Sequence, residues 1–276
     1  MTPQHVVIGM DGSLLAVRAL DWAAGEAVRR GVGLRVVYAV VDRDEAGPVL
    51  SAAASRVSGR HPGLPVVTAV AEDGTVQALV RESGHAALTV VGTRGLGGLT
   101  GLLFGSVTPR LAARARGPLL VVRGDHPCDG GRDVLLGLES DADVDAAVYA
   151  FQEAERRGVR LRVLHSLNHR QVPPELPSLV PVTSPGQERL ARNDRAEEAV
   201  PRFALTRLRE QHPGVDVETR TFRAGAAHSL LQATQEAAVV VIGAHGRGGP
   251  GAGLGPVAHT LLRRSHCPVV VVPGGG

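Results

Sequence analysis

An internal repeat divides this chain of 276 residues into two copies. Three pairs of matching segments recur in the same order: His5-Val-Val-Ile-Gly-Met10 with Asp133-Val-Leu-Leu-Gly-Leu138, Val90-Val-Gly-Thr-Arg-Gly95 with Val241-Ile-Gly-Ala-His-Gly246, and Gly117-Pro-Leu-Leu-Val-Val122 with Cys267-Pro-Val-Val-Val-Val272. A repeat of this kind predicts one fold built twice. We expect a first domain over residues 1–124, a turn-rich linker over 125–131, and a second domain over 132–276, which carries a Pro-rich insertion at Val172–Gln187.

Within each copy, short runs of Val, Leu and Ile alternate with Ala-rich helical segments. In the first copy we predict strands near 5–10, 33–41, 65–71, 87–92 and 118–123, and helices near 14–30, 49–60, 75–84 and 105–116. Apolar strands separated by helices are typical of a parallel sheet that is covered on both faces. The sequence thus predicts an α/β fold with two tandem five-stranded parallel-sheet sandwiches of Rossmann-like type. The second copy keeps this order and has a longer helix near 188–211.

The basic residues exclude several enzyme classes. All 30 of them are Arg, and the chain has no Lys. A Walker A phosphate loop and a protein kinase both require a Lys, and Schiff-base chemistry does too. The net charge is only +3, and the arginines are scattered among acids. We therefore expect the arginines on solvated faces and no binding of nucleic acid.

The compartment can be inferred from the cysteines and the apolar runs. Cys128 and Cys267 are too few for a disulfide scaffold, which favours a reducing environment. No apolar run approaches the roughly 18 residues that span a bilayer, and Met1–Gly12 has no basic region of the kind that begins a signal peptide. These features predict a cytoplasmic protein without a membrane partner.

Candidate ligand-binding residues follow the predicted strands of the first copy. Asp11 comes after the first strand, and Gly92-x2-Gly95-x9-Gly105-Ser106 comes after the fourth. Open parallel sheets bind ligands beyond the carboxyl ends of their strands. Glycines allow a close approach of the backbone, and the start of a helix favours an anion. Ser106 can cap that helix or donate its hydroxyl to a phosphate oxygen.

This spacing resembles the nucleotide motif of the universal stress protein family in its tandem form. That motif is Gly-x2-Gly-x9-Gly-Ser/Thr after the fourth strand, together with an Asp after the first. The resemblance covers nearly the whole chain and implies an adenine-nucleotide α-hydrolase-like fold that binds ATP, with or without Mg²⁺, in the first copy. It implies site residues that hold the adenine through backbone atoms (Ala39 or Val40), lie beside the ribose (Asp11, Gly92) or hold the phosphates (Gly95, Gly105, Ser106). Arg94 lies inside the motif and is our own candidate for a phosphate contact, because the spacing fixes no residue there.

The second copy departs from the motif. Gly243 and Gly246 keep their spacing, but Gly255 follows one residue early and Pro256 replaces the serine. Proline can begin a helix but offers neither a hydroxyl nor an N–H. Glu139 aligns with Asp11 and is longer by one methylene. We expect weak ATP binding or none in the second copy.

Three functions remain open at this point. The resemblance implies a non-catalytic stress-response regulator whose ATP occupancy is read by a protein partner. A slow ATP hydrolase or adenylyl-transfer enzyme is the alternative, although such chemistry needs a base and a charge clamp, for which only Asp11 and Arg94 are available. A scaffold independent of nucleotide is the third possibility, with the glycines forming a purely structural turn.

Each copy ends in an apolar strand, Leu119–Arg123 and Val269–Pro273. An exposed edge strand of this kind favours pairing with another strand. The resemblance implies pairing through these strands, either as a pseudo-dimer within one chain or as a homodimer of two chains.

Overall fold

The computed structural model of the protein describes residues 5–38, 46–71, 74–93, 107–123, 131–138, 143–166, 205–222, 226–244 and 253–274. The first copy contains β1 (His5–Met10), α1 (Leu14–Arg30), β2 (Gly33–Tyr38), α2 (Ala46–Arg60), β3 (Val66–Val70), α3 (Thr75–Ser83), β4 (Leu88–Gly92), α4 (Val107–Ala112) and β5 (Leu119–Val122). The second contains β6 (Asp133–Leu138), α5 (Val144–Arg157), β7 (Leu161–Ser166), β8 (Val217–Phe222), α7 (Ala226–Ala233), β9 (Ala237–Gly243), α8 (Pro256–Arg264) and β10 (Val269–Val272). The predicted insertion and residues 188–204 of the predicted long helix lie outside the described ranges, whereas 205–211 are helical.

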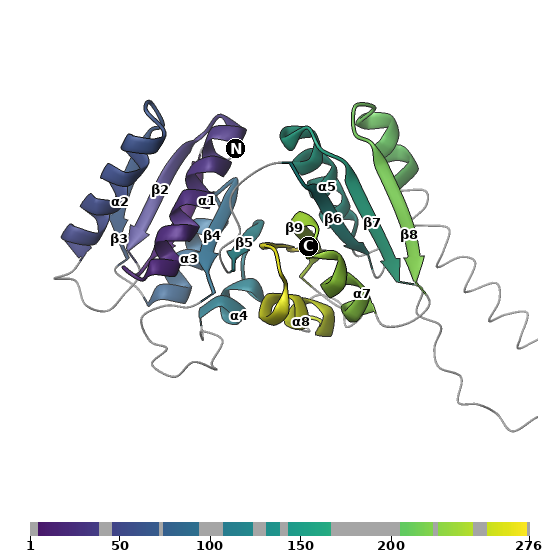
Figure 1. Cartoon of the computed structure of the whole chain (residues 1–276). Helices are drawn as coiled ribbons and strands as arrows, with labels where there is room; N and C mark the ends of the chain where they lie inside the picture. Colours follow the sequence, from purple (N-terminus) through teal and green to yellow (C-terminus); the bar gives the residue numbers. More distant parts are fainter. Residues whose placement is uncertain are drawn as a thin grey trace, which may run out of the picture.

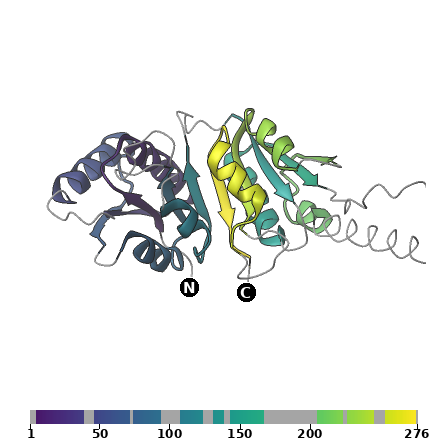
Figure 2. The ribbon, with the colours of Figure 1, turned by 90° about the horizontal axis from the view of Figure 1, so that it is seen from below.

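All ten of these strands form one sheet, in the order β3-β2-β1-β4-β5-β10-β9-β6-β7-β8. Neighbouring strands within each copy are parallel. The exception is the central pair, where β10 runs antiparallel to β5. Figure 2 shows these two strands side by side, β5 in teal and β10 in yellow. The fold is therefore the predicted pair of five-stranded parallel-sheet sandwiches, and the two terminal strands pair within the chain.

Two apolar layers, one on each face of the sheet, extend across both copies. The strands of the central pair alternate their side chains between the layers, as the two-residue period of a strand requires. On β5, Leu120 and Val122 face the helices α1, α2 and α5, while Leu119 and Val121 face α3, α4, α7 and α8. On β10, Val270 and Val272 belong to the first layer, and Val269 and Val271 belong to the second. The core therefore continues through the boundary between the copies.

Figure 1 shows the directions of several outer strands and the position of two helix ends. In Figure 1 the arrowheads of β2, β7 and β8 all point toward the lower side. These outer strands of both copies thus run toward that side, whereas β5 and β10 at the centre run antiparallel to each other. The last turns of α1 and α5 lie near each other at the opposite side (Figure 1).

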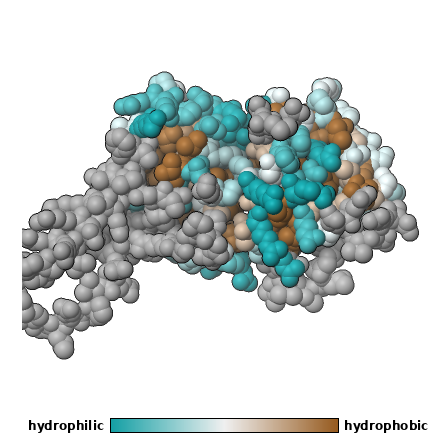
Figure 3. Space-filling model, turned by 180° about the vertical axis from the view of Figure 1, so that it is seen from behind, coloured by the Kyte–Doolittle hydropathy of each residue, from teal (hydrophilic) through white to brown (hydrophobic). Residues whose placement is uncertain are grey.

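The helices and the surface of the described residues can be compared with those of membrane-spanning segments. None of the helices among the described residues combines the length and the apolar character needed to cross a bilayer. On the face shown in Figure 3, the brown apolar areas are separate and hydrophilic residues lie between them.

Candidate functional site

The end of β1 and the end of β4 lie side by side in the sheet. These strands pair in parallel, with Val6 opposite Leu88 and Ile8 opposite Val90. The strand order reverses between them: β2 and β3 lie on the far side of β1, whereas β5 lies on the far side of β4. Such a reversal is the usual ligand position in an open parallel sheet. Asp11 directly follows β1, and Gly92 is the last residue of β4.

The turn from β1 to α1 fixes the position of Asp11. The backbone N–H of Ser13 donates to the Asp11 carboxylate Oδ1 at 3.0 Å. Gly12 has a φ of +80°, which an L side chain rarely adopts, so glycine suits this turn. Ser13 then begins α1, because its Oγ accepts the N–H of Ala16 at 3.2 Å. The half-buried carboxylate of Asp11 is thus held between the strand and the helix.

Gly92 has a packing role that the sequence motif does not reveal. A Cβ at this position would lie 3.2 Å from the carbonyl oxygen of Leu15 in the first turn of α1. The missing side chain therefore lets α1 pack closely on the end of β4. The hydroxyl of Thr108 donates to the carbonyl oxygen of Gly92 at 3.3 Å, which places the start of α4 beside the same strand end. The segment that follows Ser106 in the chain is thus anchored at this edge.

The structure places two of the eight predicted site residues, Asp11 and Gly92, at adjacent strand ends. The other six lie outside the described residues, so their roles stay predictions: Ala39, Val40, Arg94, Gly95, Gly105 and Ser106.

The corresponding edge of the second copy is built differently. A Cβ on Gly243 would overlap the carboxylate of Asp143, whose side chain is buried at the start of α5. Here a carboxylate takes the place that the first turn of α1 occupies beside Gly92. The helix α8 begins at Pro256, as predicted, and Gly255 before it provides no side-chain cap. Glu139 and Gly246 lie outside the described residues.

Comparison with known proteins identifies the family. The sequence pattern of the universal stress protein family matches residues 3–123 and 131–273. The chain belongs to the universal stress protein family. A universal stress protein of Mycolicibacterium smegmatis is 32% identical over 98% of this chain and 97% of its own length. One of Mycobacterium tuberculosis is 31% identical over 97% of each chain.

The shared fold extends to distant relatives. The crystal structure of a universal stress protein from Archaeoglobus fulgidus superimposes with a TM-score of 0.68 at 17% identity. The match covers 99% of this chain and 97% of that one. The likeness therefore includes both copies and their arrangement in one molecule.

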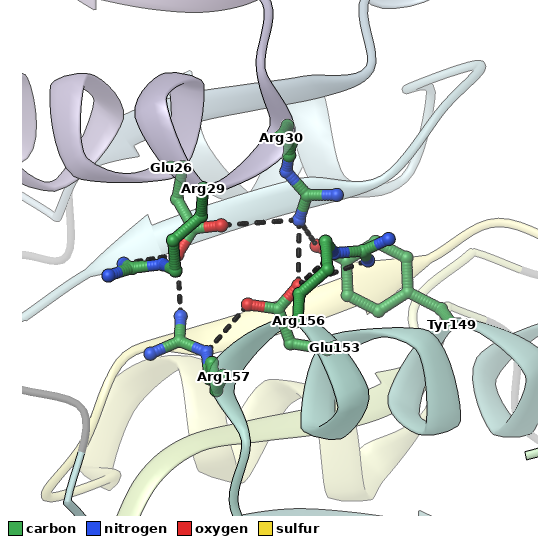
Figure 4. A network of polar contacts seen from close by, with 7 residues as sticks. All are labelled: Glu26, Arg29, Arg30, Tyr149, Glu153, Arg156 and Arg157. Carbon is green, nitrogen blue, oxygen red and sulfur yellow. Dashed lines mark hydrogen bonds and ion pairs between the residues drawn. The ribbon is translucent and has the colours of Figure 1, made fainter. Parts of the chain in front are cut away.

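This universal stress protein also has a buried group of charged side chains between its two copies (Figure 4). The group joins the last turn of α1 to the last turn of α5. We call it the seam cluster, and its members are Glu26, Arg29, Arg30, Tyr149, Glu153, Arg156 and Arg157. The side chains of Glu26, Glu153 and Arg157 are at most 2% exposed. These three side chains are therefore part of the interior, while Arg29 and Arg156 are about a quarter exposed at its margin.

Two ion pairs of the seam cluster cross from one copy to the other. Arg157 Nη2 lies 2.5 Å from Glu26 Oε1, and Arg30 Nη2 lies 2.8 Å from Glu153 Oε2. Each arginine also contacts the glutamate of its own helix, at 2.6 Å for Arg157 and 3.2 Å for Arg30. The four groups thus form a closed, electrically balanced set in which every member has an opposite charge in both copies.

An aromatic ring of the opposite copy lies against each of these two arginines. The Arg30 guanidinium is 5.5 Å from the ring centre of Tyr149 and donates to its hydroxyl at 2.7 Å. The Arg157 guanidinium is 5.7 Å from the ring centre of Trp22, which is buried. Stacking of this kind favours a desolvated guanidinium. The contacts follow the same pattern in both directions across the seam.

The charges in the seam cluster shift the pKa values of its members. Burial by itself raises the pKa of Glu153, but the surrounding Arg157, Arg30 and Arg156 outweigh that effect and lower the pKa to about 2. Burial raises the pKa of Tyr149 well above its ordinary range. The Glu153 carboxylate is therefore ionised, and the Tyr149 hydroxyl neutral, at neutral pH.

The seam cluster was not predicted from the sequence. The expectation that the arginines lie on solvated faces is wrong for Arg30 and Arg157, whose side chains are 8% and 1% exposed. The signal was present as a further matching pair, Glu26-Ala-Val-Arg-Arg-Gly-Val32 and Glu153-Ala-Glu-Arg-Arg-Gly-Val159. Arginines before a glycine that ends a helix ordinarily indicate favourable charges at the helix C-terminus. The recurrence of the glutamate with them was the part that pointed to a contact between copies.

Proposed function

We propose that this universal stress protein binds an adenine nucleotide, ATP, in its first copy and acts as a nucleotide-dependent regulator in the cytoplasm. The observation that carries the proposal is the pairing of β1 with β4. It brings Asp11 and Gly92, the acid and the first glycine of the motif, to neighbouring strand ends where the strand order reverses. Ligands of open parallel sheets bind at that position.

The proposed roles follow from the chemistry of each group. The Asp11 carboxylate suits the hydroxyl groups of a ribose, since a carboxylate accepts hydrogen bonds. Gly95, Gly105 and Ser106 would hold phosphates through backbone N–H groups and the serine hydroxyl, and Arg94 would add charge. The backbone of Ala39 or Val40 would bind the adenine. The described residues contain no group of three or more His, Cys, Asp or Glu that could hold a metal, so Mg²⁺ would be held mainly by phosphate oxygens and water.

A binding function fits these residues better than catalysis. Phosphoryl transfer requires a positioned base and a cluster of positive groups around the phosphates. Asp11 is the only acid that the motif provides, and the chain has no Lys to add to Arg94. We therefore favour a regulator that acts through a protein partner, with slow hydrolysis at most as a side activity.

Native mass spectrometry with and without Mg-ATP tests the binding proposal. We expect one nucleotide per wild-type chain and none in Gly105→Asp, where the added carboxylate repels phosphate. Gly255→Asp is the matched control in the second copy and should leave the count at one. Two nucleotides per wild-type chain would refute the assignment to the first copy alone. The absence of any bound nucleotide would refute the proposal and favour a nucleotide-independent scaffold.

Turnover distinguishes the regulator from the enzyme. Linear release of ADP over many turnovers, lost in Asp11→Ala, would establish a hydrolase and overturn the regulator. We expect instead that ADP formation stays below one equivalent per chain during an assay in which ATP remains bound.

A further inference from the structure

One helix reaches from the candidate edge of the first copy to the second copy. Ser13 caps the start of α1, and its N–H donates to the carboxylate of Asp11. The helix ends at Arg30, which belongs to the seam cluster. Its 17 residues span about 25 Å at the usual rise of an α-helix. A ligand that binds Asp11 therefore acts on one end of α1, and the other end is paired with α5.

The ion pairs of the seam cluster link the end of α1 to α5. Arg30 and Arg157 each contact Glu26 and Glu153, so a displacement of either helix alone would separate buried opposite charges. Separation is costly, because it leaves an uncompensated charge away from water. A shift of α1 that keeps these ion pairs would therefore have to move α5 as well.

The far end of α5 lies at the candidate edge of the second copy. Asp143 precedes the helix, and its buried carboxylate lies against Gly243 at the end of β9. The described contacts therefore form a continuous path from Asp11 along α1, across the seam cluster and along α5 to the end of β9.

We propose that nucleotide binding in the first copy is transmitted to the second copy through α1, the seam cluster and α5. This proposal rests on the proposed function, because it requires a nucleotide at Asp11. It assigns the degenerate second copy a role as the responding part of the chain. Coupling between sites is reciprocal, so the state of the second copy would in turn change the affinity of the first copy for the nucleotide.

Hydrogen–deuterium exchange of the full chain, with and without Mg-ATP, tests the coupling. In the wild type we expect slower exchange at the start of α1 and at least threefold slower exchange in the amides of α5. The edge strand β8, which lies at the far end of the sheet, should not change. This comparison separates transmission through α5 from a general stabilisation by the ligand, which would slow exchange throughout the chain.

Two seam variants and one control complete the test. In Glu153→Gln, Mg-ATP should still slow exchange at the start of α1 but no longer in α5, and its affinity should change at least threefold. Arg30→Lys keeps the charge but loses the planar fork, so it gives the same test with less risk to folding. Arg160→Ala removes a half-exposed residue that pairs with Asp216 in the second copy and should behave as the wild type.

The outcomes separate the two proposals. Slower exchange confined to the first copy, or equal slowing in α5 and β8, would overturn the coupling and leave the nucleotide site standing. An unchanged response of α5 in both seam variants would also overturn it. Unchanged exchange everywhere, together with no bound nucleotide in the mass spectrum, would refute the proposed function and the coupling with it.

Discussion

Replacement of Glu153 by glutamine tests whether charge in the seam cluster stabilises the fold. The folded protein lowers the pKa of this carboxyl from 4.5 to about 2. Each pKa unit corresponds to about 1.4 kcal/mol, so the ionised carboxylate contributes ~3 kcal/mol to the free energy of unfolding at pH 7. Removal of one member of a buried ion pair typically costs about 3–5 kcal/mol. We therefore expect Glu153→Gln to lower the unfolding free energy by ~3 kcal/mol.

The pH dependence gives this prediction a definite sign. A carboxyl with a depressed pKa stabilises the folded state above its unfolded value of 4.5, and this contribution is lost as the pH falls through about 2. The difference between the wild type and Glu153→Gln should therefore shrink by roughly half between pH 7 and pH 3. A loss of packing alone would give the same difference at both values.

Urea unfolding followed by the fluorescence of Trp22 provides the measurement. Trp22 is the only tryptophan of the chain and lies against Arg157, so it reports on the seam cluster directly. Glu155→Gln is the matched control, because Glu155 lies on the same helix but is 54% exposed and bonded to His212. The control should cost less than about 0.5 kcal/mol. Equal effects of the two substitutions, or no change with pH, would refute the argument from buried charge.

Three further predictions concern single residues. Gly92→Ala places a Cβ 3.2 Å from the carbonyl oxygen of Leu15 and should lower the unfolding free energy by about 1–3 kcal/mol. Gly47→Ala on α2 is the control, because its Cβ meets no atom within 4 Å, and it should be neutral or slightly stabilising in the same urea assay. Burial raises the pKa of the Cys267 thiol to about 12, so alkylation at pH 8 should leave Cys267 unmodified until urea unfolds the chain; peptide mass spectrometry of the native protein decides this. Val270→Asp puts a charge into the central strand pair, where Val270 is 2% exposed, and should increase proteolysis in both copies at once; cleavage confined to the second copy would contradict a shared core.

The strands were predictable because buried strands have a recognisable local sequence. Parallel strands covered on both faces consist of Val and Leu runs, and the predicted strands of the first copy agree with β1 to β5 to within a few residues wherever residues are described. The helix α2 begins at Ala46, earlier than predicted, because Pro48 is tolerated in a first turn that needs no N–H donor. Local sequence was enough for these elements.

Tertiary contacts explain where the prediction was wrong. The helix α4 ends at Ala112, although its sequence predicts helix to residue 116. The backbone N–H of Arg116 donates to the Ser83 hydroxyl of α3 at 3.0 Å, and Gly117 fits closely against the carbonyl oxygen of Ser83. The hydrogen bond and the close contact end the helix and direct the chain toward β5. No periodicity in a single sequence can reveal a bond to a residue that is distant along the chain.

The candidate site, too, was predictable only in part. The motif spacing predicted which residues follow β1 and β4, and the strand order brings Asp11 and Gly92 together. The contact of Gly92 with α1 was not predictable, because a glycine beside a ligand and a glycine beside a helix look alike in sequence. The seam cluster was hidden for a related reason, since a charged helix end is ordinarily solvated.

The central position of β10 has a consequence for synthesis of the chain on the ribosome. β5 is complete once Val122 has been added, but its antiparallel partner begins only at Val269. At about 5–20 residues per second, the interval is on the order of 10 s. During that time the apolar edge of β5 has no partner strand, and the same edge of another nascent chain can pair with it. Neighbouring ribosomes on one messenger therefore present the greatest opportunity for mispairing, and slower translation of the second copy should increase aggregation.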